Sequence, residues 1–183
     1  MILRYTEQIS SSFDGTIIDI ETIGKFNQRY RNTNSSKEYE YIQQVIFGYI
    51  NKEALTILYV KNENEIFELN DEVTNIITTL KKPFYAFNTS FEKGVLFHSL
   101  GRIVAFEGEL QKEKYESKAK AIKELGIPNY DDPFNDKGIL CMYAWQDGDF
   151  EKAVAHNRAC LLKERDILLF RGSREPDELT YMD

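Results

Sequence analysis

The sequence lacks the long apolar segments that membrane spans and secretory signals require. No stretch approaches the roughly 18 uninterrupted apolar residues of a membrane helix, and the first residues, MILRYTEQIS, show no basic start followed by an apolar run. Internal repeats and low-complexity tracts are absent as well. We therefore expect a cytoplasmic protein with no membrane partner.

Cysteine is scarce, since the 183 residues contain only Cys141 and Cys160. Two cysteines so far apart in the sequence are too few for a disulfide framework or a zinc cluster. Free thiols suit a reducing compartment, which agrees with a cytoplasmic location. We expect no redox chemistry.

Basic residues are outnumbered, because 23 Lys and Arg face 30 Asp and Glu and give a net charge of −7. This balance argues against a protein that wraps nucleic acid nonspecifically through counterion release. It does not exclude an enzyme that acts on nucleic acid. A carboxylate-lined metal site is itself acidic, and its metal ions supply the positive field at the reacting phosphate.

The chain is long enough, and apolar enough at 42% hydrophobic residues, to bury one core, so we expect a single domain over residues 1–183. The periodicity of the apolar residues predicts three strands, followed by helices that alternate with further strands. The predicted strands are 16–21, 41–50, 54–60, 84–87 and 102–106, and the predicted helices are 71–80, 90–100, 117–125, 138–145 and 150–170. This order is typical of an α/β fold with a mixed sheet of about five strands flanked by helices. The polar stretch 172–183 is predicted to be a loose tail.

The first predicted strand, TIIDIE, ends in two carboxylates. Alternation along the strand places Asp19 and Glu21 on one face and Ile18 and Ile20 on the other. Ligand sites in open α/β sheets lie at the carboxyl ends of strands, and carboxylate oxygens suit Mg²⁺ or Mn²⁺. Taken alone, the pair is also explained by a solvated strand end.

A second motif, FNTSFEKGVL, opens a helix directly after a predicted strand and places Asn88 at the turn and Glu92 one turn into the helix. A capping box offers a simpler explanation, in which the Glu92 carboxylate folds back to the backbone amide of Thr89. Asn88 would then be an ordinary turn residue.

Together the two motifs resemble those of the DEDD superfamily of 3′-5′ exonucleases, in which D-x-E on the first strand precedes N-x-x-F-[DE] on a later strand-to-helix turn. The likeness is greatest to the predicted exonucleases related to the proofreading domain of family B DNA polymerases. It continues through SKAKAIKELGI, the W-x-x-G-D pattern that begins at Trp145, and the pair His156-Asn157, and it covers about residues 16–170. The resemblance implies a ribonuclease-H-like fold and hydrolysis of phosphodiester bonds at the 3′ end of single-stranded DNA or RNA. It also implies two bound divalent ions, Mg²⁺ or Mn²⁺.

The resemblance assigns roles to individual residues. Asp19 would bridge both ions, Glu21 would bind one of them, and Glu92 would support the other. His156 matches the residue that orients or deprotonates the attacking water, and Asn88 supports the second motif.

The last motif of this superfamily departs from the pattern in the present sequence. An Asp is expected four or five residues after His156, but Cys160 and Leu161 stand there. Thiolate is a soft ligand and Mg²⁺ a hard cation, so Cys160 is a poor replacement for Asp. Glu164 lies one turn beyond Cys160 on nearly the same stripe, about 5.4 Å further along the helix axis. The alternative is that Cys160 is a small buried hydrophobe and His156 a hydrogen-bonded residue of the core.

The stretch 24–37, GKFNQRYRNTNSSK, contains no acidic residue and interleaves aromatic with basic side chains. Single-stranded nucleic acid is bound by basic side chains that pair with its phosphates and by aromatic side chains that stack on its bases. The stretch is therefore a candidate substrate-binding segment. Its candidate contacts are Lys25, Arg29, Tyr30 and Arg31. A solvated loop explains the same composition, and the alternative basic path is Lys112, Lys114, Lys118 and Lys120.

Three hypotheses follow from the sequence. The first is a metal-dependent 3′-5′ exonuclease, weakened by the loss of the last acidic ligand at Cys160. The second is a catalytically decayed ribonuclease-H-like module that still binds nucleic acid or has a regulatory role. The third, supported only by the negative net charge, is an interaction domain unrelated to nucleic acid.

Overall fold

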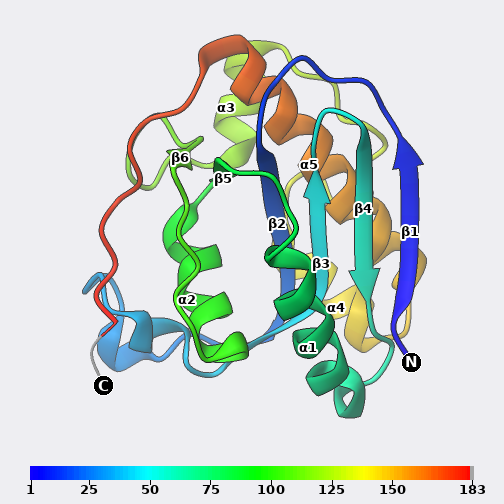
Figure 1. Cartoon of the computed structure of the whole chain (residues 1–183), viewed down its shortest axis with the longest axis vertical. Helices are drawn as coiled ribbons and strands as arrows, with labels where there is room; N and C mark the ends of the chain where they lie inside the picture. Colours follow the sequence, from blue (N-terminus) through cyan, green and yellow to red (C-terminus); the bar gives the residue numbers. More distant parts are fainter. Residues whose placement is uncertain (182–183) are drawn as a thin grey trace.

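The computed structural model describes residues 1–181. Within them the chain forms a mixed six-stranded sheet in the order β1-β4-β3-β2-β5-β6 (Figure 1). The strands are β1 Leu3–Gln8, β2 Thr16–Gly24, β3 Ile42–Ile50, β4 Ala54–Tyr59, β5 Phe84–Ala86 and β6 Gly108–Glu109. The first four strands pair antiparallel, whereas β2 with β5 and β5 with β6 pair parallel.

Helices cover both faces of the sheet in the described part of the chain. They are α1 Ile66–Ile77, α2 Thr89–Leu100, α3 Lys118–Leu125, α4 Gly138–Gln146 and α5 Phe150–Arg171, with 3₁₀ turns η1 Gln28–Tyr30, η2 Ser36–Tyr39 and η3 Glu63–Glu65. Figure 1 shows α1 and α2 on one face and α4 and α5 on the other. None of the helices within residues 1–181 is both long and apolar enough to cross a membrane.

The core lies between β2, β3 and the helices, where Ile17, Ile18 and Phe47 are completely buried. The long helix α5 approaches β3 closely at Gly48. A Cβ atom built at Gly48 would lie only 2.0 Å from Oδ1 of Asn157 on α5, so only glycine allows this approach. Because Gly48 pairs with Asp19 on β2, this contact brings α5 directly to the carboxylates of the first strand.

The predicted α/β class with a mixed sheet flanked by helices is confirmed, and the arrangement is consistent with a ribonuclease-H-like fold. Individual boundaries differ. β1 was not expected, and the sheet therefore has six strands within residues 1–181 instead of about five. The predicted strand 102–106 is wrong, since that segment is irregular and the strand, Gly108–Glu109, follows it. The predicted helix 71–80 begins earlier, at Ile66 after the η3 turn, and ends at Ile77.

The stretch 172–183, predicted to be a loose tail, is described as far as residue 181, and its last two residues lie outside the described part. Arg174 exchanges two backbone hydrogen bonds with Glu109, at 2.8 and 2.9 Å. The backbone amide of Ser36 donates to the carbonyl of Thr180 at 2.8 Å. The segment therefore runs from the edge strand β6 to the 3₁₀ turns that follow β2.

Candidate active site

One cavity of about 180 Å³ opens at the carboxyl ends of the parallel strands β2 and β5. Parallel strands end at the same edge of a sheet, so residues that follow β5 come next to those of β2. The structure places six of the predicted site residues on this cavity: Asp19 and Glu21 of β2, Asn88 and Glu92 at the start of α2, and His156 and Cys160 of α5.

Glu92 is buried, with 4% of its surface exposed, and lines the cavity. It does not form the capping box. The backbone amide and the hydroxyl of Thr89 both donate to the Glu109 carboxylate, the amide at 3.1 Å. Oε2 of Glu92 has no hydrogen-bond partner among the described residues. Burial, together with the charges of Asp19 and Glu164, holds the pKa of Glu92 well above its usual range.

Asp19 is fixed by the side-chain amide of Asn157, which donates to its carboxylate Oδ2 at 2.8 Å and to its backbone carbonyl at 3.1 Å. The other carboxylate oxygen, Oδ1, lies 3.4 Å from Nζ of Lys118, at the start of α3. The same ammonium group lies 2.6 Å from Oε1 of Glu164, which is fully buried one turn beyond Cys160. Lys118 therefore lies between an acid of β2 and an acid of α5.

The charges around Lys118 and Glu164 act on each other. Burial alone would lower the pKa of Lys118, but the neighbouring Asp19, Cys160 and Glu164 raise it well above its ordinary value. Burial raises the pKa of Glu164 well above its usual range, although Lys118 opposes this. The sequence indicated Lys118 only as part of an alternative basic substrate path. The SKAKAIKELGI segment, which begins one residue before it, was the signal that could have placed it at the site.

His156 is held by a carboxylate that the sequence did not suggest. Its Nδ1 lies 2.7 Å from Oδ1 of Asp132, which is buried in the loop before α4. The second ring nitrogen, Nε2, then faces the cavity, 3.7 Å from Oε1 of Glu21 and 3.6 Å from Sγ of Cys160. Lys163, also fully buried, holds the loop by donating to Asp132 Oδ2 at 2.8 Å.

The pKa values of Glu21, His156 and Cys160 depend on burial and on neighbouring charges. Burial opposes a charge on His156, yet Cys160, Glu21 and the hydrogen bond to Asp132 outweigh it and raise the pKa of His156 to about 12. Burial raises the pKa of Glu21 to about 7, against the opposing charge of His156. Burial likewise raises the pKa of Cys160 to about 11. The pKa of Cys160 is therefore raised by burial, while the pKa of His156 is raised by the acidic groups that surround the ring.

The donor atoms of the cavity fit divalent cations. Asp19, Glu21 and Glu92 line the cavity, Glu164 lies beside it, and the ammonium group of Lys118 lies between Asp19 and Glu164. Oε2 of Glu92 and Oε2 of Glu164 find no hydrogen-bond donor within residues 1–181. Carboxylate oxygens are the ligands that Mg²⁺ and Mn²⁺ prefer, so a bound cation would compensate these groups.

Sulfur and nitrogen donors lie at one side of the same cavity. In the described chain, two groups of three potential ligand atoms lie within 4.8 Å of one another: Glu21 with His156 and Cys160, and Asp132 with Asp136 and Cys160. Asp19 and Glu92 line the cavity but belong to neither group. The cavity therefore has an all-oxygen side and a mixed-donor side.

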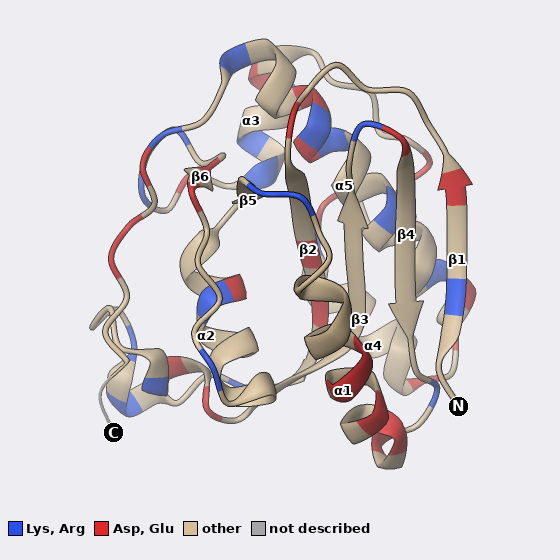
Figure 2. Cartoon of the chain, viewed as in Figure 1, with Lys and Arg blue, Asp and Glu red and all other residues tan. Residues whose placement is uncertain are grey.

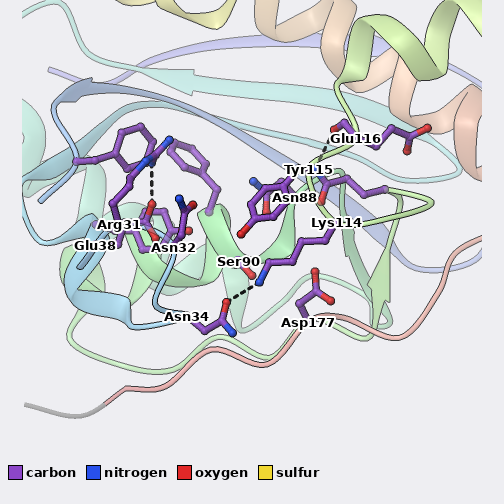
Figure 3. Close-up of a pocket in the computed structure, with 14 residues that line it drawn as sticks. Arg31, Asn32, Asn34, Glu38, Asn88, Ser90, Lys114, Tyr115, Glu116 and Asp177 are labelled. Atoms are coloured by element: carbon purple, nitrogen blue, oxygen red, sulfur yellow. Dashed lines mark hydrogen bonds and ion pairs between the residues drawn. The ribbon is translucent and has the colours of Figure 1, made fainter. Parts of the chain in front are cut away.

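A second cavity, of about 240 Å³, adjoins the first and shares Asn88 and Phe91 with it (Figure 3). Its walls combine the two basic segments that the sequence offered as alternatives. Arg31 enters from the stretch 24–37, and Lys114 enters from the loop after β6. The guanidinium of Arg31 lies 4.0 Å from the ring centroid of Phe26.

The other candidate contacts of the stretch 24–37 lie elsewhere. Arg29 and Tyr30 belong to η1, where the Arg29 guanidinium lies 5.7 Å from the Tyr30 ring centroid. Neither of them lines the second cavity, and Lys25 lines a different hollow beside Glu21. The structure thus brings Arg31 to the site but leaves Arg29 and Tyr30 at its periphery.

A scan against protein-family models, a search of curated proteins and a search of solved structures each found no match.

Proposed function

We propose that the protein is a metal-dependent 3′-5′ exonuclease that hydrolyses phosphodiester bonds of single-stranded DNA or RNA. The observation that carries this proposal is the cavity that gathers Asp19, Glu21 and Glu92, with one oxygen of Glu92 buried and unpartnered among the described residues. Such an oxygen is costly unless the carboxyl group is protonated or binds a cation. The resemblance in sequence motifs points to the same reaction.

Asp19, Glu21 and Glu92 would hold two Mg²⁺ or Mn²⁺ ions. When bound, the ions supply activation of water and stabilisation of the leaving 3′ oxygen. Asn157 positions Asp19, because its amide occupies Oδ2 and leaves Oδ1 directed to the cavity side where Lys118 lies.

His156 would contact the reacting phosphate through Nε2, because Asp132 occupies Nδ1 and fixes the ring. The acidic groups around the ring favour a proton on it, against burial. With a proton on Nε2, the ring would donate a hydrogen bond to a phosphate oxygen or to water. Acting as a general base requires that this proton first be lost, for which the ions' positive charge provides a cause.

The second cavity would hold the nucleotides that precede the 3′ end. It adjoins the metal cavity through Asn88 and Phe91, and it offers Arg31 and Lys114 to phosphates and Tyr115 for base stacking. The cavity also contains Glu38, Glu116 and Asp177, and Glu38 pairs with Arg31 at 2.7 Å, so a phosphate would have to compete with Glu38 for Arg31. Figure 2 shows basic residues on the turns between β2 and β3, while the outer end of α1 is acidic.

The decayed module remains a second candidate because of one specific observation. The ammonium of Lys118 lies 3.4 Å from Asp19 and 2.6 Å from Glu164. A protein cation so close to the bridging carboxylate competes with a metal ion for it. A protein of this kind would bind a single strand without cutting it.

The test is an incubation of a 5′-labelled single strand with Mn²⁺ or Mg²⁺. The wild type is expected to shorten the strand stepwise from the 3′ end, and Asp19→Asn is expected to leave it intact. Asp71→Asn, on the exposed face of α1, removes the same charge away from the cavity and is expected to retain activity. A wild type that binds the strand but never shortens it would support the decayed module.

A further inference from the structure

Glu21, His156 and Cys160 present three different donor atoms at ligand spacing. Sγ of Cys160 lies 3.6 Å from Nε2 of His156, and Nε2 lies 3.7 Å from Oε1 of Glu21. Ligand atoms around a tetrahedral zinc ion, with Zn–N about 2.0 Å and Zn–S about 2.3 Å, are separated by roughly 3.4 to 3.6 Å. Two edges of a tetrahedron are therefore nearly formed by the protein alone.

The imidazole is already oriented as a metal ligand. Nδ1 of His156 is engaged by Asp132 at 2.7 Å, which leaves Nε2 to face Sγ and Oε1. A carboxylate that holds the far nitrogen of a ligating histidine is the usual support of zinc-binding imidazoles. Lys163 holds that carboxylate in turn, at 2.8 Å.

The donor set selects a particular kind of cation. Sulfur and imidazole nitrogen are poor ligands for Mg²⁺ and good ligands for Zn²⁺. His156 and Cys160 are each 2% exposed, and both line the cavity, so a metal bound between them would be accessible from one side only. Three protein ligands and one open position are the composition of catalytic zinc sites.

We propose that Glu21, His156 and Cys160 form a zinc site with its fourth position open to the cavity. The inference goes beyond the proposed function, because the site would bind zinc whether or not the protein cuts nucleic acid. Glu21 and His156 belong to both sites, so zinc bound here would exclude the roles that they have in the proposed reaction. Cys160 then represents a change of metal at a position where the related pattern has Asp. The expectation that two distant cysteines cannot form a zinc cluster concerned sites built from several thiolates, whereas this one needs a single thiolate. Binding releases the thiol proton of Cys160, and any proton on Nε2 of His156, to solvent.

The experiment uses the metal alone, without nucleic acid. Metal-stripped full-length protein is titrated with Co²⁺, which adopts zinc geometry and gives a thiolate-to-cobalt charge-transfer band, and the band is then displaced with Zn²⁺. We expect the band to saturate at one equivalent and Zn²⁺ to abolish it. Asp132→Asn is expected to weaken Zn²⁺ binding by about 10- to 100-fold, because the Asp132 carboxylate that orients the His156 ring is lost.

Cys160→Ser and Cys141→Ser form a matched pair, since Cys141 is the other buried thiol and its Sγ bonds to the Ala153 carbonyl at 3.6 Å. We expect the band to vanish in Cys160→Ser and to persist in Cys141→Ser. A wild-type cobalt complex without the band overturns the zinc site, and this result requires no variant to fold. Equal Zn²⁺ uptake by wild type and folded Cys160→Ser overturns it as well. Neither result bears on Mg²⁺-dependent trimming, and a failed trimming assay leaves the cobalt spectrum unaffected.

Discussion

The ammonium group of Lys118 lies 2.6 Å from Oε1 of Glu164, a carboxylate with no exposed surface. The two residues belong to α3 and α5, and the pair lies beside Asp19. A buried ion pair contributes little net stability, but removing one partner leaves the other charge uncompensated. The pair therefore links the stability of the protein to the occupancy of its cavity.

Lys118→Met is expected to destabilise the metal-free protein by about 3–5 kcal/mol, because Glu164 loses its counter-charge. Mn²⁺ is expected to restore more stability to this variant than to the wild type, because no ammonium then competes for Asp19. Thermal melts with and without Mn²⁺ measure both effects. Lys120→Met is the control, since Lys120 is half exposed and its ion pair with Glu113 contributes at most about 1 kcal/mol. Equal stabilisation by Mn²⁺ in wild type and Lys118→Met would contradict competition between the lysine and the metal.

The metal-free protein is expected to lose stability as the pH rises from about 4.5 to about 7. The folded state raises the pKa of Glu21 from 4.5 to about 7 through burial, so it binds this proton more tightly than the unfolded chain does. The contribution, about 3 kcal/mol, is fully present below pH 4.5 and is lost as the pH rises through 7. The raised pKa values of Glu92 and Glu164 act in the same direction.

Urea unfolding in EDTA across this pH range measures the loss. Asp132 acts in the opposite direction, because its hydrogen bonds to His156 and Lys163 outweigh burial and lower its pKa. Its contribution is lost only as the pH falls below its ordinary range, outside the window. Glu92→Gln should flatten the profile, and a wild-type profile that is already flat would show that these carboxyl groups share no buried site.

Cys160→Asp is expected to change the metal preference of the site from Zn²⁺ to Mn²⁺ or Mg²⁺, because a hard oxygen ligand replaces a soft sulfur ligand. The change should exceed the roughly 10- to 100-fold effect of altering a group that only orients a ligand. Competition between Zn²⁺ and Mn²⁺ measures it, with Cys160→Ser as the uncharged control. The same variant should strengthen Mn²⁺-dependent 3′ trimming. If folded Cys160→Asp binds Mn²⁺ and leaves every strand intact, the nuclease proposal should be abandoned.

Arg31→Ala and Lys114→Ala are each expected to weaken single-strand binding and to flatten its salt dependence by about 0.7 in the logarithmic slope. Both side chains line the second cavity. Arg29→Ala removes an equal charge from the same stretch but outside that cavity, so a smaller effect is expected. Fluorescence anisotropy over a salt series provides the slopes. An Arg29 effect as large as that of Arg31 would place the strand along η1 instead.

Local patterns were sufficient to predict β2, β3 and the start of α2, because buried strands and a strand-to-helix turn carry their signal in adjacent residues. Edge elements carried little signal. β6 has two residues, too few for any periodicity, and β1, at the edge of the sheet, has four exposed and two half-buried residues without alternation. Its apolar content therefore did not distinguish it from a loop.

The site residues also fall into those with a local sequence signal and those without one. Asp19, Glu21 and Glu92 were recognisable because their motifs are local. Asp132 was not, because its contact with His156 joins a polar loop to a helix and depends on tertiary packing. A loop carboxylate has the same local sequence whether it is solvated or buried.

The loop that carries Asp132 has an unusual backbone. Tyr130, Asp131, Asn135 and Asp136 have positive φ angles between 48 and 66°, which non-glycine residues rarely adopt. Lys163 offsets this strain by binding Asp132 at 2.8 Å and Asp136 at 2.7 Å.

Such a segment can open locally without global unfolding, at a free-energy cost below that of the whole domain. Each opening would free the imidazole ring of His156 to rotate while the sheet and its carboxylates stay folded. We therefore expect the mixed-donor side of the cavity to open more often than the all-oxygen side. Amide hydrogen exchange of this loop measures how often it opens, and therefore how long the mixed-donor side stays assembled.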